Sequence, residues 1–457
     1  MTTKPVIFLA FANNRADPAH FLDKLAEEER RLRETLGKAA ELCDVVYDET
    51  ATADEILALF QRHRDRIAIF HFAGHANSYQ LLLETADGQP AAANAGGFAA
   101  FLGQQTGLEL VFLNGCSTQG QVEELLAAKV PAIIATDQKI KDDIATDFAA
   151  LFYGGLATGV SIRSAFEQAK AGIRFKKGDK TRDLFEEDAA EATPASAIPW
   201  DLHALPDYDP SAWTLWEAAG NPLFGLPPLT EQPLPPAPFP GLTSYTTDQA
   251  ELFFGRGAEI RRLFDWAVDD KTPPILLLHG QTGVGKSSLL AAGLRPRLTA
   301  RQQVRYLRRD PALGLTGTLL AVLSSPAEDG QGEGQPPDLA ARWRATKAQS
   351  TQALTVILDQ ADEALTRPAT GQADEYGALA AALVPLFADP AQPSAGKLIL
   401  VCRQEALEPI RQALAAHGLS AQCLERPLDR LDRAGIMEAV RGPAQNARLR
   451  ATYRVTI

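Results

Sequence analysis

Two residues that can do chemistry each follow an apolar run in the first half of the sequence. His75 ends "RIAIFHFAGH" (66–75), and Cys116 ends "LELVFLNGC" (108–116). The carboxyl ends of parallel strands meet at one edge of a sheet, so the two side chains lie together if their strands are neighbours. A histidine can take the proton of a cysteine thiol, and the thiolate can then attack a carbonyl carbon. The pair indicates nucleophilic catalysis, although each residue alone also fits a buried structural side chain.

The turns around these two residues offer backbone donors. Gly115 precedes the cysteine, and we expect it to let the chain turn sharply. The backbone N–H groups of Ala76, Gly115 and Cys116 are then candidates for binding an oxyanion. His71 lies four residues before His75, which raises the possibility of zinc. A strand separates the two side chains by ~13 Å along its length, so we discount a metal site and interpret His71 as structural.

The second half contains a contiguous phosphate-binding pattern. "LLLHGQTGVGKSS" (276–288) carries GxxxxGKS directly after an apolar run and before the helical "SSLLAAGL". In this pattern the backbone N–H groups face the phosphates, Lys286 reaches the β and γ phosphates, and Ser287 binds Mg²⁺. The predicted phosphate-binding residues are Gly280, Gly283, Gly285, Lys286, Ser287 and Ser288.

Two further apolar runs end in charged residues that suit the same chemistry. "TVILDQADE" (355–363) predicts a buried strand that ends in Asp359, which we expect to hold Mg²⁺ through water. "LILVCRQEAL" (398–407) places Arg403 where a sensor of the γ-phosphate would lie. An ordinary surface arginine fits the Arg403 position nearly as well.

Apolar, strand-like runs alternate with amphipathic segments in both halves of the chain. Helices are expected at 20–42 and at 161–173, the second capped by Ser161. Apolar strands separated by helices predict an α/β fold in each half, with a mostly parallel sheet covered on both faces. The expected strands are 5–12, 43–49, 66–75, 108–116, 131–137, 273–280, 353–360 and 395–404.

A proline-rich stretch divides the chain into two expected domains. Residues 228–241 read "PLTEQPLPPAPFPG", which suits a semi-stiff linker between a domain at 1–227 and one at 242–457. Residues 324–338 are expected to be a surface excursion. The final "ATYRVTI" looks like the start of a strand, so we expect the second domain to be incomplete at its C-terminus.

Composition excludes several classes of partner. The 457 residues carry a formal net charge of -12, which gives no basic footprint for nucleic acid. No apolar run approaches the ~20 residues of a membrane helix. The four cysteines form no CxxC pair, which favours a reducing, cytoplasmic setting. They are Cys43, Cys116, Cys402 and Cys423.

The first half resembles the CHAT family of caspase-like cysteine proteases. The resemblance rests on "HFAGHA" and "LNGCSTQG", and it extends to 131–170 and to "AWTLWEAAGNPLFG", which looks like the family's terminal strand. It implies His75 as base, Cys116 as nucleophile and a peptide bond as substrate. Ala76 replaces a frequent glycine. The nearest candidates for a pocket that takes a basic residue are Asp142 and Asp143.

The second half resembles the STAND family of signal-transducing P-loop ATPases. The resemblance rests on the lead-in at 238–263 and on "GKSSLLAAGLRPRL". It implies that "FFGR" lies near the adenine, through Phe254, Gly255 and Arg256. "LDQADE" departs from the family pattern because Ala361 replaces an aromatic residue and Asp362 a glutamate, which puts fast hydrolysis in doubt. Asp362 or Glu363 is the candidate for polarising water, and Pro443 for packing on the nucleotide.

Together the two resemblances imply an ATP-switched protease. A module holding ATP or ADP with Mg²⁺ would sense a trigger through a missing or separate C-terminal part and self-oligomerise. The caspase-like domain would then cleave a protein, in a bacterial conflict or programmed-death role such as defence against phage. Two alternatives stay open: a nucleotide-dependent scaffold with a silent caspase-like domain, and a housekeeping ATPase that the caspase-like domain regulates.

Overall fold

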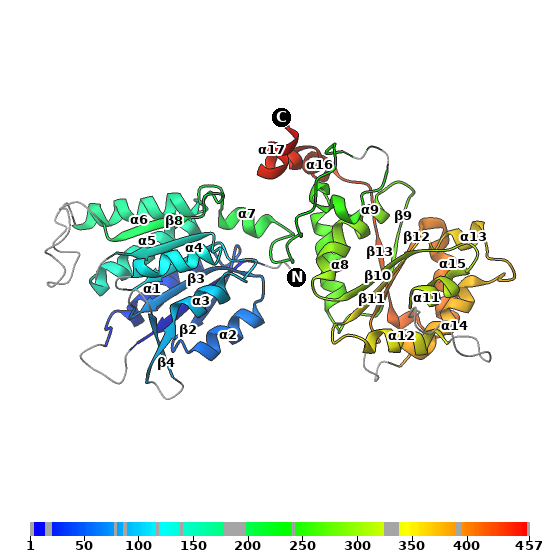
Figure 1. Ribbon diagram of the computed structural model, residues 1–457, viewed down its shortest axis with the longest axis horizontal. Helices are drawn as coiled ribbons and strands as arrows, with labels where there is room; N and C mark the ends of the chain where they lie inside the picture. Colours follow the sequence, from blue (N-terminus) through cyan, green and yellow to red (C-terminus); the bar gives the residue numbers. More distant parts are fainter. Residues whose placement is uncertain are drawn as a thin grey trace. The chain divides into compact units, whose positions relative to one another are not determined.

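The computed structural model consists of two compact units, Met1–Leu226 and Pro227–Ile457 (Figure 1). Each unit is an α/β fold built on its own sheet, as the alternation of apolar runs predicts. Cys116 and the excursion at 324–337 lie outside the described residues. The structure describes residues 4–13, 21–76, 80–85, 89–115, 118–137, 140–177, 198–239, 241, 243–323, 338–389 and 395–454.

The sheet of the first unit has the strand order β2-β1-β3-β6-β7-β8. All neighbours are parallel except β8, which pairs antiparallel with β7. The bounds are β1 Val6–Ala12, β2 Asp44–Asp48, β3 Ile67–Gly74, β6 Leu110–Asn114, β7 Ala132–Thr136 and β8 Trp200–Ala204. A mostly parallel sheet is therefore confirmed, and the order places β3 directly beside β6.

Helices cover both faces of this sheet. Apolar residues of α1, α5 and α6 pack on one face, and those of α2, α3 and α4 pack on the other. The bounds are α1 Leu25–Gly37, α2 Ala53–Arg62, α3 Ala95–Leu102, α4 Val122–Ala127, α5 Asp142–Ala157, α6 Ile162–Lys177 and α7 Leu215–Gly220. Helices cover both faces, so the central strands are almost entirely apolar, with His71 and Asn114 among the buried polar exceptions.

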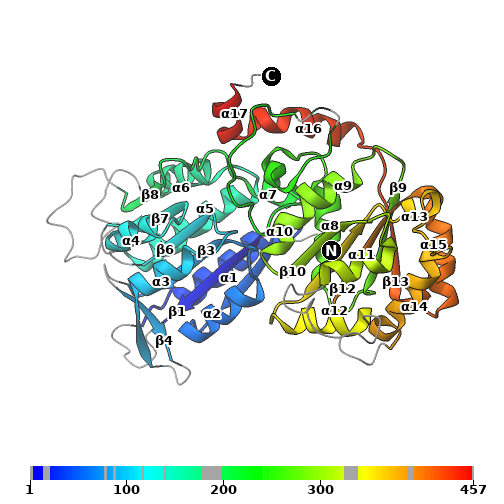
Figure 2. The ribbon, with the colours of Figure 1, turned by 45° about the vertical axis from the view of Figure 1, so that its right-hand side comes forward.

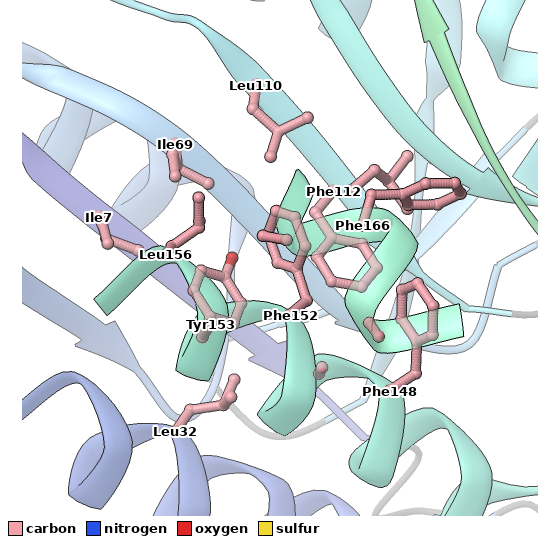
Figure 3. Packing of buried hydrophobic residues seen from close by; sticks show 14 of the residues in the cluster. Ile7, Leu32, Ile69, Leu110, Phe112, Phe148, Phe152, Tyr153, Leu156 and Phe166 are labelled. Atoms are coloured by element: carbon pink, nitrogen blue, oxygen red, sulfur yellow. The ribbon is translucent and has the colours of Figure 1, made fainter. Parts of the chain in front are cut away.

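An aromatic cluster fixes α5 on the sheet. Phe112 of β6 meets Phe148 and Phe152 of α5 edge to face, with ring centroids 6.0 and 5.5 Å apart (Figure 3). Phe148 also stacks on Trp200 of β8 at 4.2 Å. This packing anchors the helix whose first turn carries Asp142.

The structure corrects three local predictions in this unit. The expected helix at 20–42 is shorter, because α1 covers only Leu25–Gly37. The segment expected to form a terminal strand contains α7, whose N-cap Thr214 accepts a hydrogen bond from the Glu217 backbone. A hairpin of β4 (Gln80–Glu84) and β5 (Pro90–Asn94) was not predicted. The cap at Ser161 is confirmed, since its hydroxyl accepts from the Ser164 backbone at 3.2 Å.

The second unit holds a five-stranded parallel sheet with the order β10-β11-β12-β9-β13 (Figure 2). Strands β10, β11 and β12 lie on one side of β9, with β12 directly beside it, and β13 pairs with β9 on the other side. The bounds are β9 Ile275–Gly280, β10 Gln303–Arg308, β11 Leu354–Asp359, β12 Lys397–Arg403 and β13 Cys423–Pro427.

Helices α11, α12, α14 and α15 pack their apolar sides on one core with this sheet. The helix expected after GxxxxGKS forms as α9, a π-helical stretch (Leu289–Leu294) and α10. The bounds are α8 Gly257–Val268, α9 Lys286–Ser288, α10 Arg295–Thr299, α11 Gly314–Leu323, α12 Leu339–Ala348, α13 Glu363–Thr366, α14 Glu375–Phe387, α15 Gln404–Ala416, α16 Arg433–Gln445 and α17 Ala447–Tyr453.

The end of the chain differs from the expected strand. Residues up to Tyr453 form α17, whose N-cap Asn446 accepts a hydrogen bond from the Leu449 backbone at 3.1 Å. The proline-rich residues 228–239 contain neither helix nor strand, as predicted. Within the described residues, none of the helices has the length and apolar character that a membrane crossing requires.

Candidate functional sites

The two ends of β3 and β6 meet at one edge of the first sheet. Ala73 of β3 pairs with Asn114 of β6, so Gly74 and Gly115 follow at the same level. His75 comes directly after β3, and its carbonyl accepts a hydrogen bond from the Leu82 backbone at 3.0 Å. The adjacency on which the proposed His75–Cys116 pair depends is therefore present.

Gly115 is required for close packing. Its φ lies outside the left-handed region, so the backbone conformation alone does not call for a glycine. The sharp turn expected after it stays a prediction, because residues 116 and 117 lie outside the described residues. A Cβ added to Gly115 would lie 2.7 Å from the Gly74 carbonyl oxygen and 3.1 Å from the Ala76 Cβ. A side chain at position 115 would push the end of β6, which leads into Cys116, away from the segment that carries His75.

A cavity of about 780 Å³ opens at this edge. It brings together five predicted site residues: His75, Ala76, Gly115, Asp142 and Asp143. The two aspartates belong to the first turn of α5, where carboxylates are stabilised by the helix dipole. Its other charged lining residues are Asp23, Glu28, Lys24 and Lys141. Acidic groups outnumber basic ones, so the cavity suits a cationic group.

A buried polar cluster forms the floor of the cavity. Glu28 of α1 is 3% exposed, and its Oε1 accepts from Asn114 Nδ2 at 2.7 Å. His71, fully buried, places Nε2 at 3.2 Å from the same oxygen without hydrogen-bond geometry. The Trp200 indole donates to Asn114 Oδ1 at 3.4 Å. Among the described residues, Glu28 Oε2 has no partner, which leaves an acceptor at the cavity floor.

Two buried threonines hold the chain on either side of residues 116 and 117. Thr136, the last residue of β7, donates its hydroxyl to the Gly115 carbonyl. The Thr136 backbone donates to the Thr118 hydroxyl at 2.9 Å, and the Thr118 backbone lies 3.4 Å from the Thr136 hydroxyl. Both side chains are 0% exposed. These contacts fix Gly115 and Thr118 against the neighbouring strand.

Sequence reasoning missed Glu28, Asn114, Thr118 and Thr136. Asn114 and Thr136 carried a usable signal, because each is a polar residue that closes an otherwise apolar strand at the edge where His75 lies. Glu28 gave no such signal, because it lies within the charged run "AEEERR".

The predicted phosphate-binding loop has the backbone that its glycines imply. Gly283 and Gly285 have φ values of 81° and 96°, in the left-handed region that favours glycine. An added Cβ at either residue would meet no atom within 4 Å, so both face open space. Gly280 differs, since its Cβ would lie 2.3 Å from the Leu428 carbonyl oxygen. The loop lines a cavity of about 490 Å³.

Lys286 points back into this loop. Its Nζ donates to the carbonyl oxygens of Gly280 at 2.7 Å and Gln281 at 2.9 Å. Burial lowers the pKa of Lys286, and the charge of Asp362 opposes that effect. A phosphate would give this half-buried ammonium a counter-charge. Ser287 and Ser288 line the same cavity, and the Ser288 hydroxyl accepts from the Tyr245 backbone at 3.1 Å.

Asp359 lies at the end of β11, facing the same cavity, and is 2% exposed. Its Oδ2 accepts from the Tyr306 hydroxyl at 2.7 Å, and its Oδ1 from the Gln360 backbone at 2.8 Å. Burial, followed by the charge of Asp359, raises the pKa of Tyr306. Tyr306 comes from the adjacent strand β10 and was not predicted.

Two of the predicted catalytic side chains engage each other. Arg403 Nε lies 3.1 Å from Asp362 Oδ2, and the Arg403 backbone donates to Asp362 Oδ1 at 3.2 Å. Both residues line the cavity together with Glu363. Since Asp362 is occupied by Arg403, Glu363 is the better candidate for polarising water.

The "FFGR" segment divides into a lining part and a supporting part. Phe254 lines the cavity. Arg256 also lines the cavity, but its guanidinium donates hydrogen bonds to the carbonyls of Val284 at 2.9 Å and Asp429 at 2.7 Å. Arg256 therefore braces the loop. Gly255 packs against Gly435, where a Cβ would lie 2.3 Å from the carbonyl oxygen.

The expected contact of Pro443 with the nucleotide is not supported. Pro443 is buried in α16 and is not among the described residues that line the cavity. Ala439, one helical turn earlier, is the α16 residue at the cavity. The lid segment therefore reaches the site, but one turn nearer its N-terminus.

Two sequence families match the chain. The CHAT domain matches residues 2–221, and the novel STAND NTPase 1 domain, nSTAND1, matches residues 238–456. The protein thus joins a caspase-like CHAT domain to a STAND NTPase domain, and the second match indicates that it binds a nucleotide. Among curated proteins, none matches the sequence.

Several solved structures match parts of the chain at low identity. The ORC2 protein of Aeropyrum pernix, in ADPNP–ADP complexes, is 18% identical over 38% of this chain and 48% of its own, with a TM-score of 0.29. The Drosophila initiator caspase Dronc is 7% identical over 47% and 85%, with a TM-score of 0.31. The Arg specific cysteine proteinase gingipain R is 11% identical over 47% and 48%, also at 0.31. The chain spans about half the length of the archaeal protein.

Proposed function

We propose that this chain, which joins a CHAT domain to a STAND NTPase domain, is an ATP-regulated cysteine endopeptidase. One observation carries the proposal: β3 and β6 are adjacent, and Gly115 packs directly on the residues that flank His75. The residue after Gly115 is Cys116. We therefore assign a histidine and a cysteine from two distant parts of the sequence to one catalytic site.

In this proposal His75 takes the thiol proton of Cys116, and the thiolate attacks the carbonyl carbon of a peptide bond. Backbone N–H groups among Ala76, Gly115 and Cys116 bind the oxyanion. The C–N bond then breaks, and His75 returns the proton to the leaving amine. Water hydrolyses the thioester with His75 again as base, which regenerates the free thiol.

The cavity also supports a substrate class. Asp142 and Asp143 line it, and Glu28 presents an acceptor at its floor. We propose that these carboxylates bind a basic side chain of the substrate, because a buried carboxylate with an open oxygen favours a guanidinium or ammonium group. Glu28 is the new member of this set.

The nucleotide site fits ATP or ADP with Mg²⁺. Gly283, Gly285 and Lys286 offer backbone donors and a half-buried ammonium to the phosphates. Ser287 and Asp359 are the residues that would hold Mg²⁺, which would neutralise phosphate charge. Arg403 would sense the γ-phosphate, and Glu363 would polarise water. Asp362, held by Arg403, favours slow turnover.

The biological setting is proposed from the family pairing. A trigger, received through a part C-terminal to the described domain, would promote nucleotide exchange and self-oligomerisation, and the protease domain would then cleave a protein. A bacterial role in defence against phage or in programmed cell death suits that order of events. We propose domain bounds of 1–227 and 242–457, joined by the linker 228–241.

An active-site probe separates this function from the scaffold alternative. A peptidyl acyloxymethyl ketone should form one adduct, at Cys116, in the full chain, and His75→Ala should slow its formation by at least about a hundredfold. Cys43 is the internal control, because burial raises the pKa of its thiol to about 11. Equal labelling of Cys116 with and without His75, in ADP and in ATP, would favour the scaffold.

A further inference from the structure

The proline-rich segment is fastened to the last helix of its own unit. Arg448 of α17 donates from Nη2 to the Gln232 carbonyl at 2.8 Å. The Tyr453 hydroxyl, one and a half turns later, donates to the Pro235 carbonyl at 2.6 Å. Two side chains of α17 therefore hold two backbone carbonyls of the segment that joins the CHAT and STAND domains.

Glu251 completes the attachment from a third element, the 3₁₀ helix Thr247–Leu252. Its carboxylate forms a two-pronged ion pair with Arg448 and accepts from the Gln232 backbone N–H at 3.2 Å. Both backbone groups of Gln232 are thus bound. We call Arg448, Glu251, Gln232, Tyr453 and Pro235 the linker latch.

The proline content of the linker explains how a few hydrogen bonds can hold it in place. Proline lacks an N–H and restricts φ, so a proline-rich chain loses little entropy when it is held. The carbonyls of such a chain have no partners within it. The planar guanidinium of Arg448 can bind a carboxylate and a carbonyl at once, which a lysine at this position cannot reproduce.

The elements of the latch also border the nucleotide cavity. The 3₁₀ helix is tied to the helical segment after the phosphate-binding loop, since the Thr247 hydroxyl donates to the Ala291 carbonyl at 3.1 Å. Helix α16, which leads into α17, contributes Ala439 to the cavity lining. Gly442 of α16 packs on Phe254, where a Cβ would lie 2.4 Å from the ring. A nucleotide in the cavity therefore touches the supports of the latch.

We propose that the linker latch is the output of the nucleotide switch: it holds the interdomain segment in the ADP state and releases it in the ATP state. The γ-phosphate, which ADP lacks, would bind at Lys286 and Arg403, and the resulting shift of the cavity lining would reach α16 at Ala439 and α17 beyond it. This inference rests on the proposed nucleotide switch, but it requires no peptidase activity.

Hydrogen–deuterium exchange of the full chain tests the latch at the linker amides between residues 229 and 239. With Mg²⁺–ADP, Arg448→Ala should speed their exchange at least about fivefold, because it removes charged hydrogen bonds. Tyr453→Phe, which deletes one hydroxyl, should give a smaller increase. Arg450→Ala is the matched control, since Arg450 is an exposed arginine of the same helix.

Nucleotide dependence tests the coupling. In the wild type, replacing ADP by a non-hydrolysable ATP analogue should speed linker exchange at least about threefold, and Arg448→Ala should abolish that difference. Linker exchange that Arg448→Ala leaves unchanged would overturn the latch. An effect of Arg448→Ala with no effect of nucleotide would overturn the coupling. Calorimetric binding of both nucleotides separates these outcomes from a failure of the nucleotide site itself.

Discussion

The two candidate sites are built in opposite ways. The phosphate-binding loop is one stretch of nine residues, 280–288, and its chemistry is contained in its own order of glycines, lysine and serine. The protease site takes His75 from one strand end and Cys116 from another, 41 positions later. The first site is local and can be recognised from the sequence alone. The second exists only because the sheet places β3 beside β6.

Two buried carboxylates, one in each domain, differ in a similar way. Glu375 is saturated: it pairs with Arg309 and accepts from the backbones of Leu315 and Ala369. Glu28 receives one hydrogen bond, from Asn114, and keeps an oxygen open to its cavity. Glu375 therefore serves stability, whereas Glu28 remains available to a ligand.

Removal of the saturated carboxylate should have the largest effect. Glu375→Ala leaves Arg309 buried without a counter-charge, and we expect it to lower the free energy of unfolding of the second domain by about 3–5 kcal/mol. Urea denaturation measures the change. Glu408→Ala is the control, because Glu408 forms an exposed pair with Arg411 and should leave the stability almost unchanged. Equal losses would contradict the structural role of Glu375.

Removal of the Lys286 ammonium group should cost the nucleotide site most of its affinity for ATP. Lys286→Ala is expected to weaken ATP binding by about 2–4 kcal/mol, or thirtyfold to a thousandfold, because it removes the charge that faces the phosphates. Isothermal titration calorimetry gives the affinity. Lys271→Ala, at an exposed position of the same domain, should bind as the wild type does. Unchanged binding in Lys286→Ala would remove the phosphate site from this loop.

The two domains should respond to acid with opposite signs. Burial raises the pKa of Glu109, in the first domain, to about 7. Because the folded state binds that proton more tightly, this contribution to stability is complete below about pH 4.5 and declines as the pH rises to 7, by about 2–3 kcal/mol. Burial alone would raise the pKa of Glu375, but Arg309 and two backbone donors lower it overall. Its contribution is lost as the pH falls through that lowered value.

Thermal unfolding between pH 4 and pH 8 tests both signs. The transition of the first domain should fall in temperature above pH 5, and Glu109→Gln should flatten that dependence. The transition of the second domain should fall only toward pH 4. A first-domain transition that is equally pH-dependent in Glu109→Gln would show that another group is responsible.

The smallest expected effect concerns the open carboxylate. Glu28→Gln keeps an acceptor for Asn114 but removes the charge at the cavity floor, so we expect benzamidine to bind about tenfold more weakly. Glu27→Gln is the matched control, because Glu27 is exposed and paired with Lys24. Calorimetry on the full chain measures both. Benzamidine that does not bind the wild type, or binds Glu28→Gln equally, would contradict the assigned substrate class.

The contrast between a contiguous site and a site assembled from distant strands also explains what could be predicted from the sequence. The apolar central strands, the mostly parallel sheets and the phosphate-binding loop were predictable, because apolar runs and GxxxxGKS are local signals. The less apolar strands β4, β5, β8, β10 and β13 were not predicted. The adjacency of β3 and β6 is a property of chain topology. From the sequence alone it could only be assumed, and the predicted pairing of His75 with Cys116 depended on that assumption. Glu28, Thr136 and Tyr306 were missed since each acts through a contact with a distant strand or helix.

The interaction partners of individual side chains were the second feature that could not be predicted from the sequence. Arg256 and Asp362 match family positions, yet the first braces the loop and the second pairs with Arg403. Pro443 was placed one helical turn too far along α16, because a motif does not reveal which residue of a helix reaches a cavity.

The most direct test of the central claim is the pH profile of Cys116 alkylation, followed by peptide mass mapping, in the wild type and in His75→Ala. A paired thiol should react with a pKa well below ~8.5, and His75→Ala should return it toward that value. Repeating the profile with ADP and with an ATP analogue should show the low pKa in the ATP state at least. A profile that neither His75→Ala nor the nucleotide changes would contradict an ATP-regulated peptidase.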